Sequence, residues 1–257
     1  LKTRVGEDGK SVPIGTFGDT AELQRAIDKK GWNEYEIIAS GNRMTHKING
    51  VIMSEIIDDY GRKNGILALQ LHQGPPMEVQ FKDIRLKRLP LAGKKKAVFI
   101  AGTDSHSRGT HEHNAGCTLL AAALNENMPG MQAVVYRDGW PEDPSALDNA
   151  DTIILYADGG PRHPVIPHLE QVDALHKKGV GIVCMHYGVE VPKGEAGDRF
   201  LDWTGGHFET HWSVNPVWTA DFKSLPEHPI TRGVPPFGIR DEFYYHMRFR
   251  DDLDGIT

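Results

Sequence analysis

The feature that most constrains the fold is a change in hydrophobic patterning near residue 90. Before it, apolar and polar residues alternate along short segments, as in strands with one buried face. After it, apolar residues form continuous runs such as 97–101, which is typical of parallel strands covered on both faces. The stretch between them contains proline, glycine and three consecutive lysines. We therefore expect a multi-domain chain with a domain at 1–89, a linker at 90–96 and a second domain at 97–257.

The first domain is predicted to be part of an antiparallel β-sandwich. Alternation predicts strands at 32–40, 43–48, 51–58, 65–72 and 77–89, and a short helix at 21–29. Asn49-Gly50 predicts a two-residue hairpin turn, because both positions of a type I′ turn need positive φ. In 65–72, Leu67, Leu69 and Leu71 would face a core, and the polar face would present Gln70 and His72 as substrate-binding candidates.

The second domain is predicted to be a doubly wound α/β sheet of flavodoxin-like type. Buried strands are expected at 97–101, 132–136, 152–156 and 181–185, with helices at 115–125 and 167–178. In such sheets, ligands bind at the carboxyl ends of the strands. That rule selects three polar loops, at 102–114, 157–163 and 186–190, as the candidate site.

The loop at 102–114 holds His106, His111 and His113. Imidazoles are common acid–base groups near neutral pH and common metal ligands, although single histidines can simply cap a helix or bond the backbone. We expect the cluster to be functional, with His111 and His113 as catalytic candidates and His106 as a substrate ligand. The sequence is also compatible with a bound divalent metal ion, with His111, His113 and His186 as its ligands. Asp158 and Tyr187, from the other two loops, are further substrate-binding candidates.

The segment 180–188 runs from a predicted strand into a turn that ends in Gly188, which is the setting of a nucleophile elbow. The residue two before that glycine is His186, while Cys184 lies back in the strand and is expected to be buried and unreactive. Glutamine amidotransferases of this architecture carry a cysteine at that position of the elbow, so amidotransferase action is disfavoured here. His186 instead suits acid–base work or ligand binding. Further along, Asp241, Glu242 and Tyr245 are either sugar ligands or surface residues.

Composition excludes several function classes. The formal charge of −6 provides no basic field for nucleic acid or an anionic membrane. No apolar run approaches the roughly 20 residues of a membrane helix. The two cysteines are too few for a disulfide framework. The composition is compatible with a homo-oligomer of this chain.

Residues 97–249 resemble the trehalose-utilisation (ThuA-like) family. The motifs that match lie at 102–117, 154–160, 181–190, 205–212 and 228–245. The resemblance implies a class I glutamine-amidotransferase-like fold and a role in the catabolism of trehalose and related disaccharides, through 3-keto sugars. By position, it also implies a pocket lined by His106, His111, His113, His186, Glu190, His207 and His211, with Glu190 as a fourth catalytic candidate.

Residues 1–89 resemble the C-terminal half of the 3-keto-disaccharide hydrolase family, a concanavalin-like jelly roll, through the segments 31–51 and 65–89. That family cleaves glycosidic bonds of sugars oxidised at C3. The two resemblances together favour an enzyme of the hydrolase or lyase type acting on a small sugar, with non-catalytic carbohydrate binding as the alternative. We also expect a fragment of a longer bacterial protein, periplasmic or secreted rather than cytoplasmic, that lacks half of the jelly roll and the final strands of the second domain.

Overall fold

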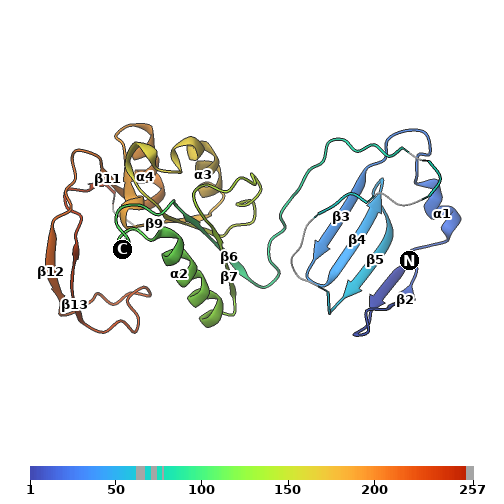
Figure 1. Cartoon of the computed structure of the whole chain (residues 1–257), viewed down its shortest axis with the longest axis horizontal. Helices are drawn as coiled ribbons and strands as arrows, with labels where there is room; N and C mark the ends of the chain where they lie inside the picture. The colour runs from blue at the N-terminus through green and yellow to red at the C-terminus, as the bar shows by residue number, and fades with distance from the viewer. Residues whose placement is uncertain (62–66, 71–73, 77, 253–257) are drawn as a thin grey trace. The chain divides into compact units, whose positions relative to one another are not determined.

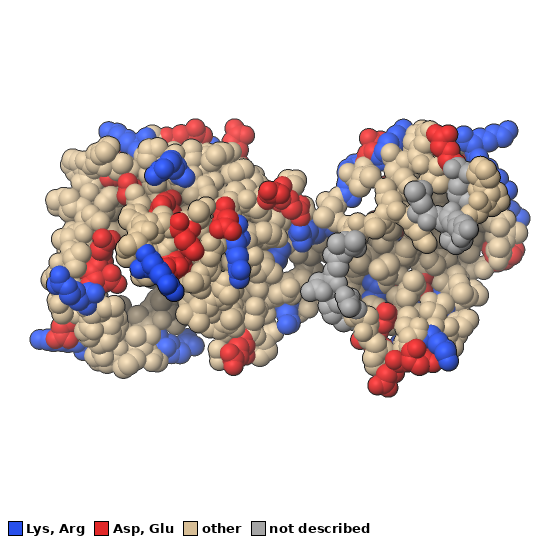
Figure 2. Space-filling model, in the orientation of Figure 1, with Lys and Arg blue, Asp and Glu red and all other residues tan. Residues whose placement is uncertain are grey.

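The computed structural model describes residues 1–61, 67–70, 74–76 and 78–252. The chain divides into two compact units, Leu1–Arg85 and Leu86–Thr257, and each is described by itself (Figure 1). None of the helices in the described part of the chain is long and apolar enough to cross a bilayer. On the face shown in Figure 2, acidic and basic side chains are interspersed.

Unit 1 is a five-stranded sheet with one short helix. Its elements are β1 (Lys2–Val5), β2 (Ser11–Gly15), α1 (Thr20–Arg25), β3 (Tyr35–Ser40), β4 (Arg43–Ile48) and β5 (Val51–Asp58). The strand order is β2-β1-β5-β4-β3, in which only the β1–β5 pair is parallel. Asn49 and Gly50 have φ of 49° and 80°, as the predicted turn between β4 and β5 requires.

The strands observed in unit 1 differ from the predicted ones in two respects. Strands β1 and β2 are short and polar, so alternation did not reveal them. The predicted strands at 65–72 and 77–89 are absent from their described residues, where 67–70 and 78–89 have no ladder partner. The predicted inward stripe is open to solvent there, since Leu67 is 85% and Leu69 58% exposed. Leu71 and His72 lie outside the described residues. The described part of unit 1 contains one sheet.

The core of unit 2 is a four-stranded parallel sheet. Its strands are β6 (Lys95–Ala101), β7 (Met131–Tyr136), β8 (Thr152–Tyr156) and β9 (Gly181–Met185), in the order β7-β6-β8-β9. The helices are α2 (His113–Asn127), α3 (Leu169–His176) and α4 (Glu195–Thr204). The predicted strands 152–156 and 181–185 match β8 and β9 residue for residue.

Apolar residues on both faces of this sheet explain the layering. Alternate residues of β6 point to opposite sides, so that Val98 and Ile100 join a cluster with α3 and α4. Ala97 and Phe99 join a second cluster with α2. Helices therefore cover both faces, as Figure 1 shows, and the prediction of a doubly wound parallel sheet is confirmed.

Smaller elements surround the sheet. Three 3-10 turns, η1 (Gly160–Arg162), η2 (Ile166–His168) and η3 (His186–Val189), lie in the loops after β8 and β9. A small sheet joins β10 (Glu190–Val191), β11 (Gly206–Glu209) and β14 (Arg248–Phe249). The remaining pair, β12 (Val217–Phe222) and β13 (Phe237–Glu242), forms an antiparallel ribbon. The segment after β13 leads back toward the sheet and carries Tyr244.

Candidate functional site

The three polar loops meet at the carboxyl edge of the parallel sheet. Ala101, the last residue of β6, pairs with Tyr156 at the end of β8, and Tyr156 pairs with Met185 at the end of β9. The loops that begin at residues 102, 157 and 186 therefore emerge side by side. β6 has β7 on one side and β8 on the other, so chain order reverses here, which is where open α/β sheets bind ligands.

Asp158 is the centre of the cluster. The Ser105 hydroxyl donates to its Oδ1 atom at 2.7 Å, and His111 Nδ1 lies 3.1 Å from the same oxygen. His113 Nε2 and His106 Nδ1 lie 3.8 and 4.0 Å from it. Burial alone would raise the pKa of Asp158, but the hydrogen bonds from Ser105 and His111 outweigh that effect and lower it. Asp158 is therefore a carboxylate at neutral pH.

His113 is held in a single orientation. It is the first residue of α2 and is fully buried, with its ring edge-on to Tyr156 at 4.8 Å. Its Nδ1 donates to the backbone carbonyl of Thr103 at 2.9 Å. Nε2 is buried and has no hydrogen-bond partner. In the neutral ring this atom carries the lone pair, and it is directed toward Asp158.

A hydrogen-bonded chain leads from Asp158 to a tyrosine. His111 Nε2 lies 3.2 Å from His186 Nε2, and His186 Nδ1 lies 3.2 Å from the Tyr244 hydroxyl. A neutral imidazole has one N–H, so if His111 donates from Nδ1 to Asp158, His186 must donate from Nε2 to His111. Tyr244 then donates to His186 Nδ1. Asp158, His111, His186 and Tyr244 thus form one continuous path for protons, which we call the relay.

Burial sets the protonation of the outer relay members. It lowers the pKa of His186, and the neighbouring His111 lowers it further, while Glu242 and Asp241 act in the opposite direction. Burial also raises the pKa of Tyr244. Both side chains are therefore neutral near pH 7.

The backbone at the site is strained. His106 and His186 have φ of 62° and 49°, in the left-handed region that non-glycine residues seldom adopt. Gly188 is needed in the turn after β9, because a Cβ there would lie 2.8 Å from the carbonyl oxygen of Leu155. His163 secures this turn by donating from Nε2 to the Gly188 carbonyl at 3.0 Å. The strained turn directs His186 toward His111.

The site lacks the geometry of a nucleophilic triad. Ser105 Oγ and Asp158 Oδ1 both contact Nδ1 of His111, at 3.3 and 3.1 Å, whereas a triad places serine and carboxylate on opposite nitrogens. Cys184 is half-buried within β9, and burial raises its thiol pKa to about 12. Burial likewise raises the pKa of Cys117 to about 11. Neither thiol is an activated nucleophile.

The remaining candidate site residues divide into two groups. Tyr187 lies beside the cluster, with its ring centroid 5.7 Å from that of His111. Glu190, in β10, accepts a hydrogen bond from Thr210 at 2.8 Å. Asp241 and Glu242 are exposed at the end of β13 and act on the pKa of His186. These residues lie at or near the site.

Five candidates are buried in the core, exposed at the surface or outside the described residues. His207 is 3% exposed, so the structure places it in the core, next to Gly197 of α4, rather than on a pocket wall. His211 is exposed in the turn after β11. Tyr245 is exposed, and its backbone pairs with Val214, whereas the preceding Tyr244 reaches the site. Gln70 is exposed in unit 1, and His72 lies outside the described residues.

Sequence reasoning missed Ser105 and Tyr244. Ser105 precedes His106 directly in a loop already selected as the site, so its position was the available signal. Tyr244 had no such signal, because its neighbour Tyr245 has the same chemistry and only the fold distinguishes them.

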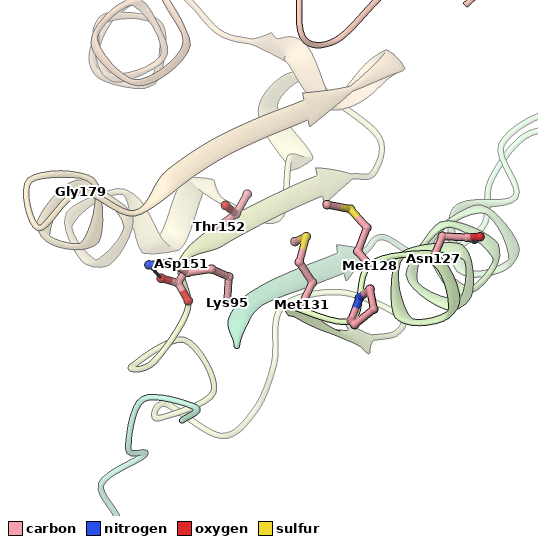
Figure 3. A pocket seen from close by; sticks show the side chains of 9 residues that line it. Lys95, Asn127, Met128, Met131, Asp151, Thr152 and Gly179 are labelled. Atoms are coloured by element: carbon pink, nitrogen blue, oxygen red, sulfur yellow. Dashed lines mark hydrogen bonds and ion pairs between the residues drawn. The ribbon is translucent and has the colours of Figure 1, made fainter. Parts of the chain in front are cut away.

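The opposite edge of the sheet contains a shallow hollow of ≈ 740 Å³. Its lining includes Lys95, Met128, Met131 and Asp151, as Figure 3 shows. Asp151 is engaged by Lys95 Nζ at 2.7 Å and by the backbone N–H of Lys96 at 2.8 Å. This hollow has no group comparable with the histidine cluster, and we place the candidate site at the carboxyl edge.

Comparison with known proteins provides two similarities. A family model described as a 3-keto-alpha-glucoside-1,2-lyase-like domain matches residues 6–87, about a third of the chain. The crystal structure of a ThuA-like protein from Bacteroides uniformis ATCC 8492 is 16% identical, with a TM-score of 0.43 and coverage of 68% of each chain. No curated protein sequence matches the chain.

Proposed function

We propose that this protein cleaves a glycosidic bond of a sugar oxidised at C3 and that the relay in unit 2 transfers the protons. The observation that carries the proposal is the unbroken path from Asp158 through His111 and His186 to Tyr244. The similarity of residues 6–87 to a 3-keto-alpha-glucoside-1,2-lyase-like domain supports the choice of substrate class.

The chemistry of a 3-keto glycoside matches such a relay. The ketone at C3 acidifies the hydrogen on C2, so a base removes that proton and the electron pair forms the C1–C2 double bond. The C1–O bond breaks, and the departing oxygen takes a proton from an acid. Addition of water across the double bond would complete hydrolysis. The protein must therefore accept one proton and supply another at adjacent atoms.

Tyr244 and His186 are the proposed proton-transfer pair. Tyr244 forms the outer end of the relay, and His186 links it to His111 and the Asp158 carboxylate. When the Tyr244 proton passes along two imidazoles, Asp158 stabilises the resulting positive charge on His111, and the Tyr244 oxygen becomes the base for the C2 proton. The same hydroxyl then supplies that proton to the departing oxygen. Glu190, Tyr187 and the exposed His106 would bind sugar hydroxyl groups beside the relay.

The test uses the full chain with 3-keto-trehalose as substrate and follows free glucose. We expect release of glucose by the wild type and a decrease in kcat of at least about 10²-fold in Tyr244→Phe, which keeps the ring and removes the hydroxyl. Tyr60→Phe, at a side chain that is 62% exposed in unit 1, is the matched control and should retain activity.

Three outcomes would contradict the proposal. Unchanged turnover in Tyr244→Phe would remove Tyr244 from the mechanism. Saturable binding of 3-keto-trehalose without glucose release would assign a carbohydrate-binding role in place of catalysis. Absence of both binding and release would exclude this disaccharide as the substrate.

A further inference from the structure

One oxygen of Asp158 is surrounded by electron-pair donors. His106, His111 and Asp158 each offer one ligand atom, and these atoms all lie within 4.8 Å of one another. His113 Nε2 approaches the same carboxylate oxygen at 3.8 Å from the buried side. Two imidazoles and one carboxylate, supplied by two adjacent loops, therefore form a mutually close set, and a third imidazole approaches its carboxylate from the buried side.

The orientation of His113 is the independent observation that points to a cation. Its Nδ1–H is used by the Thr103 carbonyl, and its buried Nε2 has no hydrogen-bond partner although it lies 3.8 Å from the Asp158 carboxylate. A buried imidazole nitrogen without a partner is unfavourable, and folded proteins seldom leave such an atom unsatisfied. A cation bound between Nε2 and the carboxylate would make favourable contacts with both groups. A metal-binding histidine that donates its other N–H to a backbone carbonyl is a common arrangement.

We infer that His106, His111, His113 and Asp158 bind one divalent transition-metal ion. For bonds of about 2.1 Å, neighbouring ligand atoms lie about 3.0–3.5 Å apart in octahedral to tetrahedral geometry. His111 Nδ1 and Asp158 Oδ1 already meet this spacing at 3.1 Å. His113 and His106, at 3.8 and 4.0 Å from Asp158, would need to move closer to it when the ion binds.

The donor set selects the kind of ion. Imidazole nitrogen suits Zn²⁺, Fe²⁺, Co²⁺ and similar ions, whereas Mg²⁺ and Ca²⁺ prefer sites made of oxygen ligands. The site is also open on one side: the side chain of His106 is 53% exposed, and those of His111 and His113 are 14% and 0% exposed. An open side leaves a coordination position for a small ligand, as in catalytic metal centres.

Metal binding would reverse the hydrogen bonds from His111 to Tyr244, so that in the metal-bound protein Tyr244 would supply a proton outward instead of passing one inward to His111. If a metal occupies Nδ1 of His111, the ring carries its proton on Nε2, and His111 then donates to His186 Nε2. His186 in turn donates from Nδ1 to the Tyr244 oxygen, so the Tyr244 hydroxyl proton is directed outward to a ligand. This inference goes beyond the proposed reaction, because binding of the ion needs no sugar.

The experiment measures metal binding by the full chain after dialysis against EDTA. Co²⁺ addition should produce a visible d–d absorption band that saturates at one ion per chain, and Zn²⁺ should abolish it. A large excess of Mg²⁺ should not. Asp158→Asn and His106→Ala should each weaken Co²⁺ binding by at least about tenfold. His176→Ala, in the last turn of α3, is the matched histidine control and should bind as the wild type does.

Two results would overturn the inference: absence of a saturable Co²⁺ band in the wild type, or equal affinity in the wild type and His106→Ala. His106 is exposed, so His106→Ala decides the question even if Asp158→Asn fails to fold, which thermal denaturation would reveal. Glucose release from 3-keto-trehalose tests the proposed reaction separately, so its absence would leave the metal-binding result intact.

Discussion

His163 should make the stability of unit 2 depend on pH in a defined window. The side chain is 1% exposed, and both ring nitrogens are used. Nε2 donates to the Gly188 carbonyl at 3.0 Å, and Nδ1 accepts from the backbone N–H of Val165 at 3.1 Å. Protonation would place a charge in the core and set a hydrogen on Nδ1 against the Val165 N–H. Burial accordingly lowers the pKa of His163 to about 4, although the hydrogen bond to Gly188 opposes this shift.

The sign and the magnitude follow from linkage. An unfolded histidine has a pKa near 6.5, so between pH 6.5 and 4 the unfolded chain binds a proton that the folded chain does not. Stability is therefore complete above pH 6.5 and is lost as pH falls toward 4. A difference of about 2.5 pKa units corresponds to a loss of about 3 kcal/mol, a large part of the stability of an ordinary domain.

The assay compares the wild type with His163→Gln, whose neutral amide can still donate to Gly188. Urea unfolding would be followed by tryptophan fluorescence between pH 7.5 and 4, since Trp140, Trp203, Trp212 and Trp218 all lie in unit 2. The variant should be less stable at pH 7.5, because its amide packs less well against Phe200, which contacts the imidazole edge-on at 5.7 Å. Its free energy of unfolding should fall by about 3 kcal/mol less than that of the wild type over this range.

Parallel pH profiles for the two proteins would refute the reasoning. A His163 resonance that titrates near pH 6.5 in NMR spectra of the folded protein would do the same. Either result would mean that the ring has access to solvent or to a proton acceptor, and the anchor of the turn at Gly188 would need another explanation.

Two further predictions concern the core near the site. Burial raises the thiol pKa of Cys184 to about 12, so this thiol should react with a thiol reagent about a thousandfold more slowly than an exposed cysteine at pH 7. Urea-unfolded protein is the control, and rapid labelling of Cys184 in the native protein would contradict the prediction. Gly102→Ala should lower the free energy of unfolding by about 1–3 kcal/mol in a urea titration, because the new Cβ would lie 2.6 Å from the Cβ of Ala157. Gly130→Ala is the control and should have little effect, because nothing lies within 4 Å of the Cβ position there.

Much of unit 2 could be predicted from the sequence because its signals are local. The apolar runs at 152–156 and 181–185 became β8 and β9, since a strand covered on both faces has few polar positions. The location of the site followed from the same runs, because parallel strands place their carboxyl ends at one edge. The turn at Asn49-Gly50 is equally local, as it depends on the φ angles of two residues.

Only the tertiary structure decided which side chains meet. Tyr244 reaches His186 across 58 residues, and the neighbouring Tyr245 does not, although both have the same local pattern. His207 lies in a polar, histidine-rich segment, but α4 covers it, and Gly197 makes room for its ring. Leu67 and Leu69 alternate like strand residues yet remain exposed, because a strand also needs a neighbour for its backbone groups. Hydrophobic periodicity indicates which face of a segment could be buried, whereas the residues that it packs against depend on the positions of segments distant in the sequence.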